Sequence, residues 1–291
     1  MAATHARLEG RLAVISTPIG NLGDLSPRAR DELSAAEWVA AEDTRRTGQL
    51  LTTLGLSRPL VSLHEHNERE RIDELLVKLR AGARIALVSD AGTPLLSDPG
   101  FELVRRVSSE GISVVAVPGP SAITAALSIA GLPTERFSFE GFLPARLAER
   151  RTRLAELAAE TRTQVYFEAP HRIVEALEDM SAVFGAQRRA VVARELTKLF
   201  ETVYRGTLGE LVGLARSDAN FTRGEITVVV EGAPRASAQD SARAALDTTL
   251  RALLPELAPS KAASVAARLT GARRNEAYAR ALELAREIGA G

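Results

Sequence analysis

The chain has 291 residues, of which 45% are hydrophobic and 25% charged, a composition typical of a globular protein with two domains and room for a small third one. Lysine plus arginine and aspartate plus glutamate both total 37, so net charge does not argue for a nucleic-acid partner, and any basic surface must be local. The absence of cysteine excludes disulfides, thiolate metal sites and a cysteine nucleophile. The first ten residues lack a signal-peptide pattern and no apolar run is long enough to span a membrane, so we expect a cytoplasmic protein.

The first part of the chain alternates between apolar runs and amphipathic segments. We expect strands at residues 12–16, 38–41, 60–63, 84–89 and 113–117, and helices at residues 27–36, 44–54, 68–80 and 101–109. Ser26 is the expected N-cap of the first helix, with Pro27 at its first position. The expected N-cap of the second helix is Asp43 or Thr44, and that of the fourth is Ser97 or Asp98. This alternation predicts a mainly parallel sheet with right-handed crossovers.

A second alternating unit begins with a helix after Pro120. We expect strands near residues 165–167, 190–193 and 226–230, and helices at residues 172–183 and 208–215. Residues 233–240 are small and polar with one proline, and so predict a linker. Three short helices follow at residues 242–254, 261–269 and 275–287, with Ser260 and Asn275 as N-caps. The predicted domains are an α/β domain over residues 1–120, a second α/β domain over 121–233 and a helical domain over 241–291.

Three of the expected strands end in turns rich in glycine and proline, within residues 15–24, 87–100 and 117–122. Open α/β sheets bind ligands where parallel strands end at their carboxyl side, so these turns predict one crevice that belongs to a small-molecule enzyme. Neither G-x-G-x-x-G nor G-x-x-x-x-G-K-[ST] occurs in the chain, which argues against a dinucleotide-binding fingerprint and a P-loop. The first turn, taken alone, is equally consistent with an ordinary strand-to-helix connection.

The second and third turns carry more specific signals. Gly92 allows close approach of the backbone to a ligand, and Thr93 adds a hydrogen-bonding side chain. Ser121 opens a helix whose free N–H groups could receive a ligand carboxylate.

Charged clusters follow two other strands of the first unit. Glu42 and Asp43, with Arg45 close behind, are expected at the rim of the crevice, although acids at a helix start are also explained by the helix dipole. His64 and His66 would share one face of an extended segment, as a metal site requires, but no third ligand is evident. A polar rim that positions substrate is the better interpretation of this segment.

The strands of the second unit also end in charged segments. Glu195 and Lys198 could flank an acceptor hydroxyl, with Arg172 or Arg194 holding phosphates. An ion-pair network at a domain interface would show the same residues, and this alternative stays open.

Together these segments resemble the tetrapyrrole methylase superfamily, and closely its branch of small-subunit (16S) rRNA cytidine 2′-O-methyltransferases. The similarity covers about residues 12–232 and resumes in the C-terminal helices. The strings that carry it are STPIGNLGD (16–24), AEDTR (41–45), HEHN (64–67), SDAGTP (89–94), PGPS (118–121) and RELTK (194–198). Tetrapyrrole-modifying relatives typically have a glycine-rich first loop of the G-x-G-P-G-D type, which STPIGN replaces in this chain.

The resemblance implies a two-domain tetrapyrrole-methylase-like fold with S-adenosylmethionine in a cleft between the α/β domains, a small helical C-terminal domain, and a homodimer. By motif position, the expected cofactor-binding residues of the first unit and of the helix that follows it are Pro18, Ile19, Gly20, Asp90, Ala91, Gly92, Thr93, Leu96, Ser121 and Ala122. The second unit would add Tyr166, Gly224 and Glu225 near the adenine.

Methyl transfer to a ribose hydroxyl needs an in-line approach and loss of the hydroxyl proton. Positioning can supply roughly 7–11 kcal/mol of the barrier reduction, and a nearby base removes the proton. The catalytic candidates are Glu195, Glu42, Asp43 and Lys198, and the sequence does not rank the three acids. The expected substrate-binding residues are Arg45, His64, Asn67, Arg172 and Arg194.

The C-terminal helices carry a modest basic excess. Residues 261–287 contain six basic and three acidic side chains, a net charge of +3, which would help to bind phosphates. A solvated helical surface has the same composition, and Tyr278 is the only aromatic residue there, so base-specific reading is not expected.

The predicted function is S-adenosylmethionine-dependent 2′-O-methylation of a cytidine in the decoding centre of 16S rRNA, within the small ribosomal subunit. The alternatives are methylation of a tetrapyrrole or other small metabolite, and a non-catalytic RNA-binding factor of ribosome assembly.

Overall fold

The computed structural model describes residues 10–64, 68–234 and 238–289. The chain divides into two compact units, residues 1–233 and residues 234–291. No helix within the described ranges is long and apolar enough to cross a membrane.

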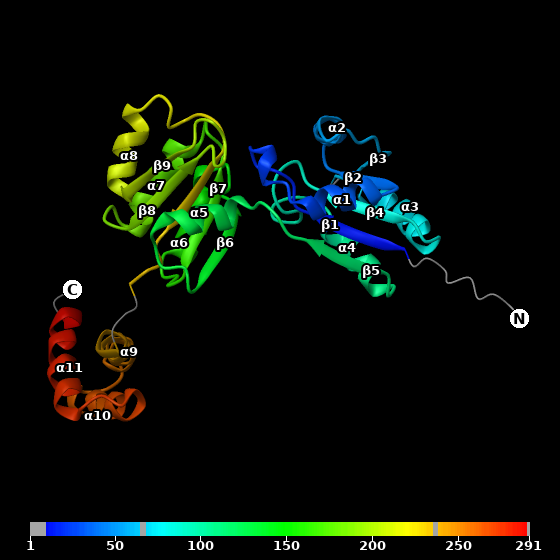
Figure 1. Ribbon diagram of the computed structural model, residues 1–291. Coiled ribbons are helices and arrows are strands. Elements are labelled where there is room, and N and C mark those ends of the chain that lie inside the picture. Colours follow the sequence, from blue (N-terminus) through cyan, green and yellow to red (C-terminus); the bar gives the residue numbers. More distant parts are fainter. Residues whose placement is uncertain (1–9, 65–67, 235–237, 290–291) are drawn as a thin grey trace, which may run out of the picture. The chain divides into compact units, whose positions relative to one another are not determined.

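The first unit opens with a five-stranded parallel sheet in the order β3-β2-β4-β1-β5 (Figure 1). Its strands are β1 (Arg11–Ile15), β2 (Trp38–Ala41), β3 (Leu60–Ser62), β4 (Arg84–Val88) and β5 (Ser113–Val117). The connecting helices are α1 (Pro27–Ala35), α2 (Thr44–Thr53), α3 (Glu68–Arg80) and α4 (Phe101–Ser109), with a 3-10 turn η1 (Leu22–Asp24). Two apolar clusters cover the sheet, one with α3 and α4 and the other with α1 and α2. The predicted parallel α/β sheet is confirmed.

The helix starts of this sheet test the predicted caps. Ser26 accepts the backbone N–H of Ala29, and Asp43 accepts that of Arg45, so both caps are confirmed. The prediction of Ser97 or Asp98 as the cap of α4 is wrong, because that helix begins after Gly100. Gly100 has φ +116°, and a Cβ there would lie 2.9 Å from Leu87 Cδ2, so the chain turns tightly before the helix starts.

The second sheet has five strands in the order β6-β7-β10-β8-β9. They are β6 (Phe137–Phe142), β7 (Thr163–Glu168), β8 (Arg189–Arg194), β9 (Thr202–Thr207) and β10 (Ile226–Val230). Only β6 and β7 pair in parallel, whereas β10 is antiparallel to β7 and β8, and β9 is antiparallel to β8. Since β10 opposes both neighbours, β7 and β8 run in the same direction and end at the same edge, where Ile226 pairs with Glu168 and Arg194.

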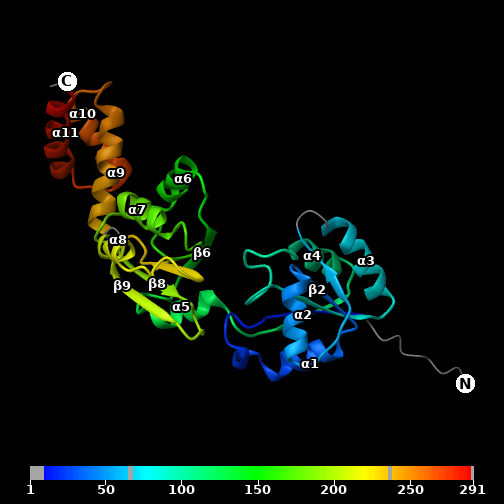
Figure 2. The ribbon, with the colours of Figure 1, turned by 90° about the horizontal axis from the view of Figure 1, so that it is seen from above.

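Helices cover both faces of the second sheet (Figure 2). They are α5 (Ala122–Ala130), α6 (Leu147–Leu157), α7 (Ile173–Phe184) and α8 (Leu208–Ser217). Alternate residues of each strand point to opposite faces: Tyr166 and Val228 pack in the cluster with α6, α7 and α8, while Val165 and Val229 pack with α5. Strands β6 and β9 and helix α6 were not predicted from the sequence.

The second unit contains α9 (Ala238–Leu253), α10 (Pro259–Thr270) and α11 (Arg274–Gly289) around a small core of leucine and alanine. The predicted caps of the last two helices are wrong. Ala258 is the N-cap of α10, with Pro259 at its first position, and Asn275 lies inside α11. A proline already set at helical φ starts α10 one residue before the predicted cap, Ser260.

Candidate active site

The turns after β1, β4 and β5 interlock. The backbones of Thr17 and Gly92 exchange two hydrogen bonds of 2.9 and 3.0 Å. The Ser16 and Thr93 hydroxyls lie 2.9 Å apart, and Thr93 Oγ1 donates to the Pro120 carbonyl at 3.2 Å. Gly92 has φ +83°, and a Cβ there would lie 3.3 Å from the Ile19 side chain. The prediction that these three turns meet at one place is confirmed.

A second set of loops is joined at the edge of the mixed sheet where β7 and β8 end. Glu195 donates its backbone N–H to the Glu225 carbonyl, and the Glu225 N–H donates to Glu195 Oε1, both at 2.9 Å. Lys198 Nζ lies 2.8 Å from Glu195 Oε1 and 3.3 Å from Glu225 Oε1. A Cβ on Gly224 would lie 2.3 Å from the Glu195 carboxyl, so only glycine fits there.

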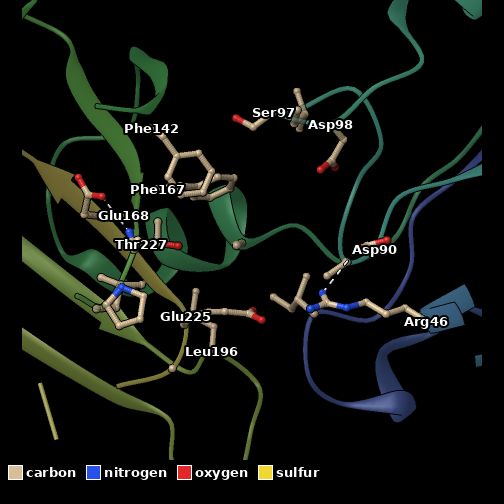
Figure 3. Close-up of a pocket in the computed structure, with 18 residues that line it drawn as sticks. Arg46, Asp90, Ser97, Asp98, Phe142, Phe167, Glu168, Leu196, Glu225 and Thr227 are labelled. Carbon is tan, nitrogen blue, oxygen red and sulfur yellow. Dashed lines mark hydrogen bonds and ion pairs between the residues drawn. The ribbon is translucent and has the colours of Figure 1, made fainter. Parts of the chain in front are cut away.

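A cavity of about 400 Å³ is lined by both sets of loops (Figure 3). The parallel sheet and its loops contribute Ile19, Arg46, Asp90, Ala91, Leu96, Ser97 and Asp98. Helix α5, the second sheet and its loops contribute Ala122, Phe142, Phe167, Glu168, Ala169, Pro170, Leu196, Gly224, Glu225, Ile226 and Thr227. Apolar walls with a few polar groups at this volume are typical of a small-molecule site.

Most predicted cofactor-binding residues lie in or beside this cavity. Those that line it are Ile19, Asp90, Ala91, Leu96, Ala122, Gly224 and Glu225. Pro18, Gly20, Gly92, Thr93 and Ser121 lie in the same loops or at the start of α5 without lining it. Their role toward a cofactor stays a prediction.

Tyr166 lies elsewhere. It is fully buried in the core of the second sheet, donates its hydroxyl to Gln164, and has a pKa raised by burial. Its neighbour Phe167 points to the opposite face and lines the cavity instead. In a strand an offset of one residue reverses the face, which is why motif position alone selected the wrong neighbour for the cavity wall.

The acidic catalytic candidates are held as ionised groups or lie outside the cavity lining. Side-chain and backbone hydrogen bonds from Arg45 hold the pKa of Asp43 at about 2. Burial raises the pKa of Glu195, but the Lys198 ammonium and the Glu225 N–H outweigh it, so that the pKa lies below its usual value. Glu42 is half-buried and is not part of the cavity wall. Carboxylates with a low pKa are weak proton acceptors.

Lys198 is held in its charged form. Burial lowers its pKa, but hydrogen bonding and charge from Glu195 and Glu225 outweigh this, and the pKa lies above its usual value. An ammonium between two carboxylates is suited to fixing loops rather than to accepting a proton.

Two of the predicted substrate-binding arginines support the backbone. Arg172 donates to the carbonyls of Leu143 and Pro144 at 2.5 and 3.0 Å. Arg194 is buried and donates to the Phe200 carbonyl at 3.0 Å. These contacts fix loops near the cavity.

The other predicted substrate contacts come from the first unit. Arg45 is exposed and pairs with Asp43 at 3.0 Å, and His64 is exposed just beyond β3. Asn67 lies outside the described residues. Within the part of the chain that the structure describes, no three histidine, aspartate or glutamate side chains are grouped as a metal site requires.

Sequence reasoning missed one aromatic wall of the cavity. Phe142 and Phe139 pack edge-on against Phe167, with ring centroids 5.7 and 4.8 Å away. The alternation of phenylalanine in residues 137–139 was a signal for β6, but a register shift between Phe139 and Gly141 interrupts it. A β-bulge of this kind is common beside active sites, where it redirects a side chain.

Backbone strain is concentrated at the same cavity. The non-glycine residues with positive φ in the described part of the chain are Leu95, Ser97, Glu195 and Thr197, at +73°, +70°, +54° and +65°. Leu95 and Ser97 flank Leu96, and Glu195 and Thr197 flank Leu196. Both of these flanked leucines line the cavity. Such conformations cost on the order of 1–3 kcal/mol each and cluster at functional sites.

Comparison with known proteins agrees with this architecture. Residues 11–212 match the family described as Tetrapyrrole (Corrin/Porphyrin) Methylases, and residues 240–285 match the RsmI C-terminal HTH domain. The chain belongs to the tetrapyrrole methylase family and is therefore a methyltransferase, as the motif strings predicted.

Within this family the chain groups with proteins named Ribosomal RNA small subunit methyltransferase I. The protein of Xylella fastidiosa (strain Temecula1) is 53% identical over 270 residues, which cover 92% of this chain and 98% of the relative. Those of Pseudomonas aeruginosa and Escherichia coli O157:H7 are 51% and 48% identical, covering 94% of this chain and 97% and 96% of the relatives.

Solved structures support the fold. A cobalt precorrin-4 methyltransferase aligns with a TM-score of 0.57 at 18% identity, and uroporphyrin-III-C-methyltransferase from Thermus thermophilus with 0.55 at 20% identity. Each alignment covers 76% of this chain and 94% of the solved chain.

Proposed function

We propose that this protein transfers a methyl group from S-adenosylmethionine to the 2′-hydroxyl of a cytidine in the decoding centre of 16S rRNA. The observation that carries the proposal is identity of about half of all residues, over nearly the whole length, with proteins named Ribosomal RNA small subunit methyltransferase I. The choice of the ribose hydroxyl and of a decoding-centre cytidine rests on the resemblance of the six motif strings.

The residues around the cavity fit S-adenosylmethionine. Phe142, Phe167 and Leu196 offer apolar surface for a flat base, Arg46 a cation for a carboxylate, and Asp90 a carboxylate for hydroxyl or amino groups. When bound, the cofactor supplies an electrophilic methyl group on a positively charged sulfur. The chain's own residues bind and orient it, and the interlocked turns hold the walls in place before it enters.

The C-terminal unit suits a role in RNA binding. Lys261, Arg268, Arg273 and Arg274 are exposed, whereas Arg280 is engaged by Asp247 at 2.6 Å and Glu283 at 2.7 Å. Exposed basic groups without such partners are the ones that contact phosphates, and their contribution should weaken as salt rises. We also propose, from the same resemblance, a cytoplasmic homodimer that acts on RNA within the assembled small subunit.

To test this, the protein is incubated with labelled S-adenosylmethionine and small subunits from cells that lack this enzyme. The methyl group is then located by mass spectrometry. We expect one 2′-O-methylcytidine in the decoding centre. Subunits from wild-type cells, already modified, are the matched control and should accept no label. Naked 16S rRNA as a third substrate distinguishes free RNA from the subunit, and sedimentation determines the oligomeric state.

Cofactor binding measured by calorimetry separates the alternatives. Intact binding with no transfer to either RNA would contradict the rRNA proposal and favour a small-metabolite substrate. Absence of binding would favour a non-catalytic assembly factor.

A further inference from the structure

Helix α11, the last helix of the C-terminal unit (Figure 1), has two exposed sides that differ in charge. On one side the charged groups neutralise each other within the unit. Arg280 pairs with Asp247 of α9 at 2.6 Å and with Glu283 at 2.7 Å. Further along the same side, Glu287 pairs with Arg251 of α9 at 2.9 Å. These groups are already engaged and offer little net charge to a partner.

The other side of α11 carries a ridge of exposed residues that includes no acid. Its members are spaced four positions apart and are Arg274, Tyr278, Leu282 and Arg286. Residues four apart are neighbours on a helix surface, so the two arginines flank the tyrosine and the leucine. The ion pairs among the described residues of this unit involve neither arginine. The third acid of the helix, Glu276, lies outside the ridge and lines a hollow beside α9.

Tyr278 is not needed to build the unit. The core consists of leucine and alanine side chains, and Tyr278 is not among them. The residue is 45% exposed, and its hydroxyl forms no hydrogen bond with a described residue. It is also the only aromatic residue in the chain after Phe221. The ring is therefore displayed to solvent between two cations and is free to contact a partner.

The chemistry of this ridge fits RNA with unpaired nucleotides. Guanidinium groups bind phosphates, and an exposed aromatic ring stacks on an unpaired base. At 1.5 Å per residue, Arg274 lies about 6 Å and Arg286 about 12 Å along the helix from Tyr278, so their long side chains can reach phosphates on either side of a stacked base. Continuous duplex RNA offers no such base, because its bases are stacked and its major groove is too narrow for side chains.

A second copy of this chain fits the ridge less well. A two-fold contact brings the same surface of both copies together. Arg274 and Arg286 of each copy would then face those of the other, with no acid on the ridge to offset their repulsion.

We propose that Tyr278 stacks on an unpaired base of 16S rRNA while Arg274 and Arg286 hold the neighbouring phosphates. This inference rests on the proposed function, which supplies the RNA. The C-terminal unit then selects a segment of rRNA that contains unpaired nucleotides, whereas phosphate contacts alone would accept any duplex. Stacking accepts every base, so this selection does not depend on base identity.

To test this, the full-length protein is titrated with two labelled RNA hairpins, one with unpaired nucleotides bulged from its stem and one fully paired. We expect the wild type to bind the bulged hairpin more tightly. Tyr278→Ala should weaken that binding about 5- to 150-fold, the range expected for loss of one base stack, and leave binding to the paired hairpin unchanged.

Two further variants separate stacking from apolar contact. Tyr278→Phe keeps the ring and should bind like the wild type, whereas Tyr278→Leu keeps apolar volume without the ring and should bind like Tyr278→Ala. The matched control is Leu214→Ala, which removes an exposed apolar side chain from α8, where Leu214 is 40% exposed. This control should bind both hairpins normally. Arg274→Gln should weaken both hairpins equally and lower the salt dependence of binding by about one phosphate contact.

Methylation of small subunits distinguishes positioning from chemistry. Tyr278→Ala should raise the KM for subunits by the factor lost in hairpin affinity, with kcat and cofactor affinity unchanged. A merely structural role of Tyr278 would instead lower the melting temperature and reduce binding to both hairpins.

Equal affinity of Tyr278→Ala and Leu214→Ala for the bulged hairpin would overturn the inference. Wild-type affinity in Tyr278→Leu would also overturn it, because apolar contact would then be sufficient. A change in the sedimentation of Tyr278→Ala would overturn it by assigning the ridge to a contact between copies of the chain. Methylation of subunits without any preference for the bulged hairpin would overturn this inference alone, whereas that preference without methylation would overturn the proposed function alone.

Discussion

The side chain of Lys198 lies directly on the backbone of Gly20. A Cβ added to Gly20 would be 2.2 Å from Lys198 Cγ and 3.1 Å from the Leu196 carbonyl oxygen. This contact joins the turn after β1 to the loop after β8, and both segments border the cavity. The approach requires glycine at position 20 and the long aliphatic stem of the lysine opposite it.

Gly20→Ala should therefore weaken cofactor binding. The added methyl group cannot be accommodated without moving the Lys198 stem or the first turn, and we expect the dissociation constant for S-adenosylmethionine to rise about tenfold, which corresponds to about 1.4 kcal/mol. Calorimetric titration measures this. The control is Gly213→Ala, on the exposed side of α8 with no atom within 4 Å of the new methyl. This variant should bind normally and gain up to about 1 kcal/mol of stability. Equal binding by both variants would contradict the prediction.

Lys198→Met separates the charge of Lys198 from its stem. Methionine keeps the contact with Gly20, but Glu195 and Glu225 lose their ammonium partner, and we expect a loss of about 1–2 kcal/mol in the free energy of unfolding at pH 7. The pKa of Glu195 lies below its usual 4.5 in the folded protein. Its pairing therefore stabilises the fold above that pH and is lost as the pH falls through the folded pKa.

The difference between wild type and Lys198→Met should accordingly shrink as the pH falls below 4.5, the usual pKa of this carboxyl group. It should also shrink above the usual lysine pKa of 10.5, since the pKa of Lys198 is raised in the folded protein. Urea denaturation at several pH values measures the difference, and a loss that is the same at every pH would count against the ion pair as its cause.

Asp98→Asn should make the protein more stable at neutral pH. Folding raises the pKa of Asp98 from 3.8 to about 6, so ionisation of this carboxyl opposes folding increasingly between those values. At pH 7.5 the penalty is about 1–3 kcal/mol, reduced by the partial exposure of the side chain, and asparagine removes it. The gain in melting temperature should disappear below pH 4. The control is Glu102→Gln at the start of α4, where the Glu102 carboxylate pairs with Arg105 at 2.7 Å, and this variant should show no such gain. A less stable Asp98→Asn at pH 7.5 would disprove this explanation.

Asp179→Asn should be strongly destabilising. Asp179 is 3% exposed and accepts from Arg150 and Arg151, both at 2.7 Å, and Arg150 is itself 2% exposed. Removal of the buried carboxylate leaves the Arg150 guanidinium with one carboxylate partner, Glu175 at 3.3 Å, and the Ala145 carbonyl, also at 3.3 Å. We expect a loss of about 3–5 kcal/mol in the free energy of unfolding.

The neighbouring Glu178→Gln is the control for this variant. Glu178 pairs with Arg216 on the exposed surface of α7 at 2.7 Å, and its loss should cost no more than about 1 kcal/mol. Denaturant unfolding compares the two variants, and similar losses in both would show that burial of the Arg150 pair is not the cause.

The amino-acid sequence by itself determined the local features of this protein. Strand β2 and helices α3 and α4 occupy the predicted residues, and Ser26 and Asp43 cap the predicted helices. These features depend on side-chain periodicity and on hydrogen bonds between residues a few positions apart, which are visible in a linear chain. The glycine- and proline-rich turns are also visible in the linear chain. They indicated the cavity because the carboxyl ends of parallel strands share one edge of the sheet.

Tertiary structure alone decided what depends on distant partners. Strands β6 and β9 form by pairing with β7 and β8 at the two edges of the mixed sheet, and the short alternation within each was too weak a signal by itself. Helices α6, α7 and α8 cover the face that carries Tyr166, and α5 packs on the face that carries Phe167. This arrangement decided that Phe167, and not Tyr166, reaches the cavity. From the sequence, Asp98 was one of two predicted caps of α4. Its raised pKa depends on burial and on nearby carboxylates, which surround it only after folding. Periodicity and capping act over a few residues, whereas burial and electrostatic interaction depend on distances that exist only after the chain has folded.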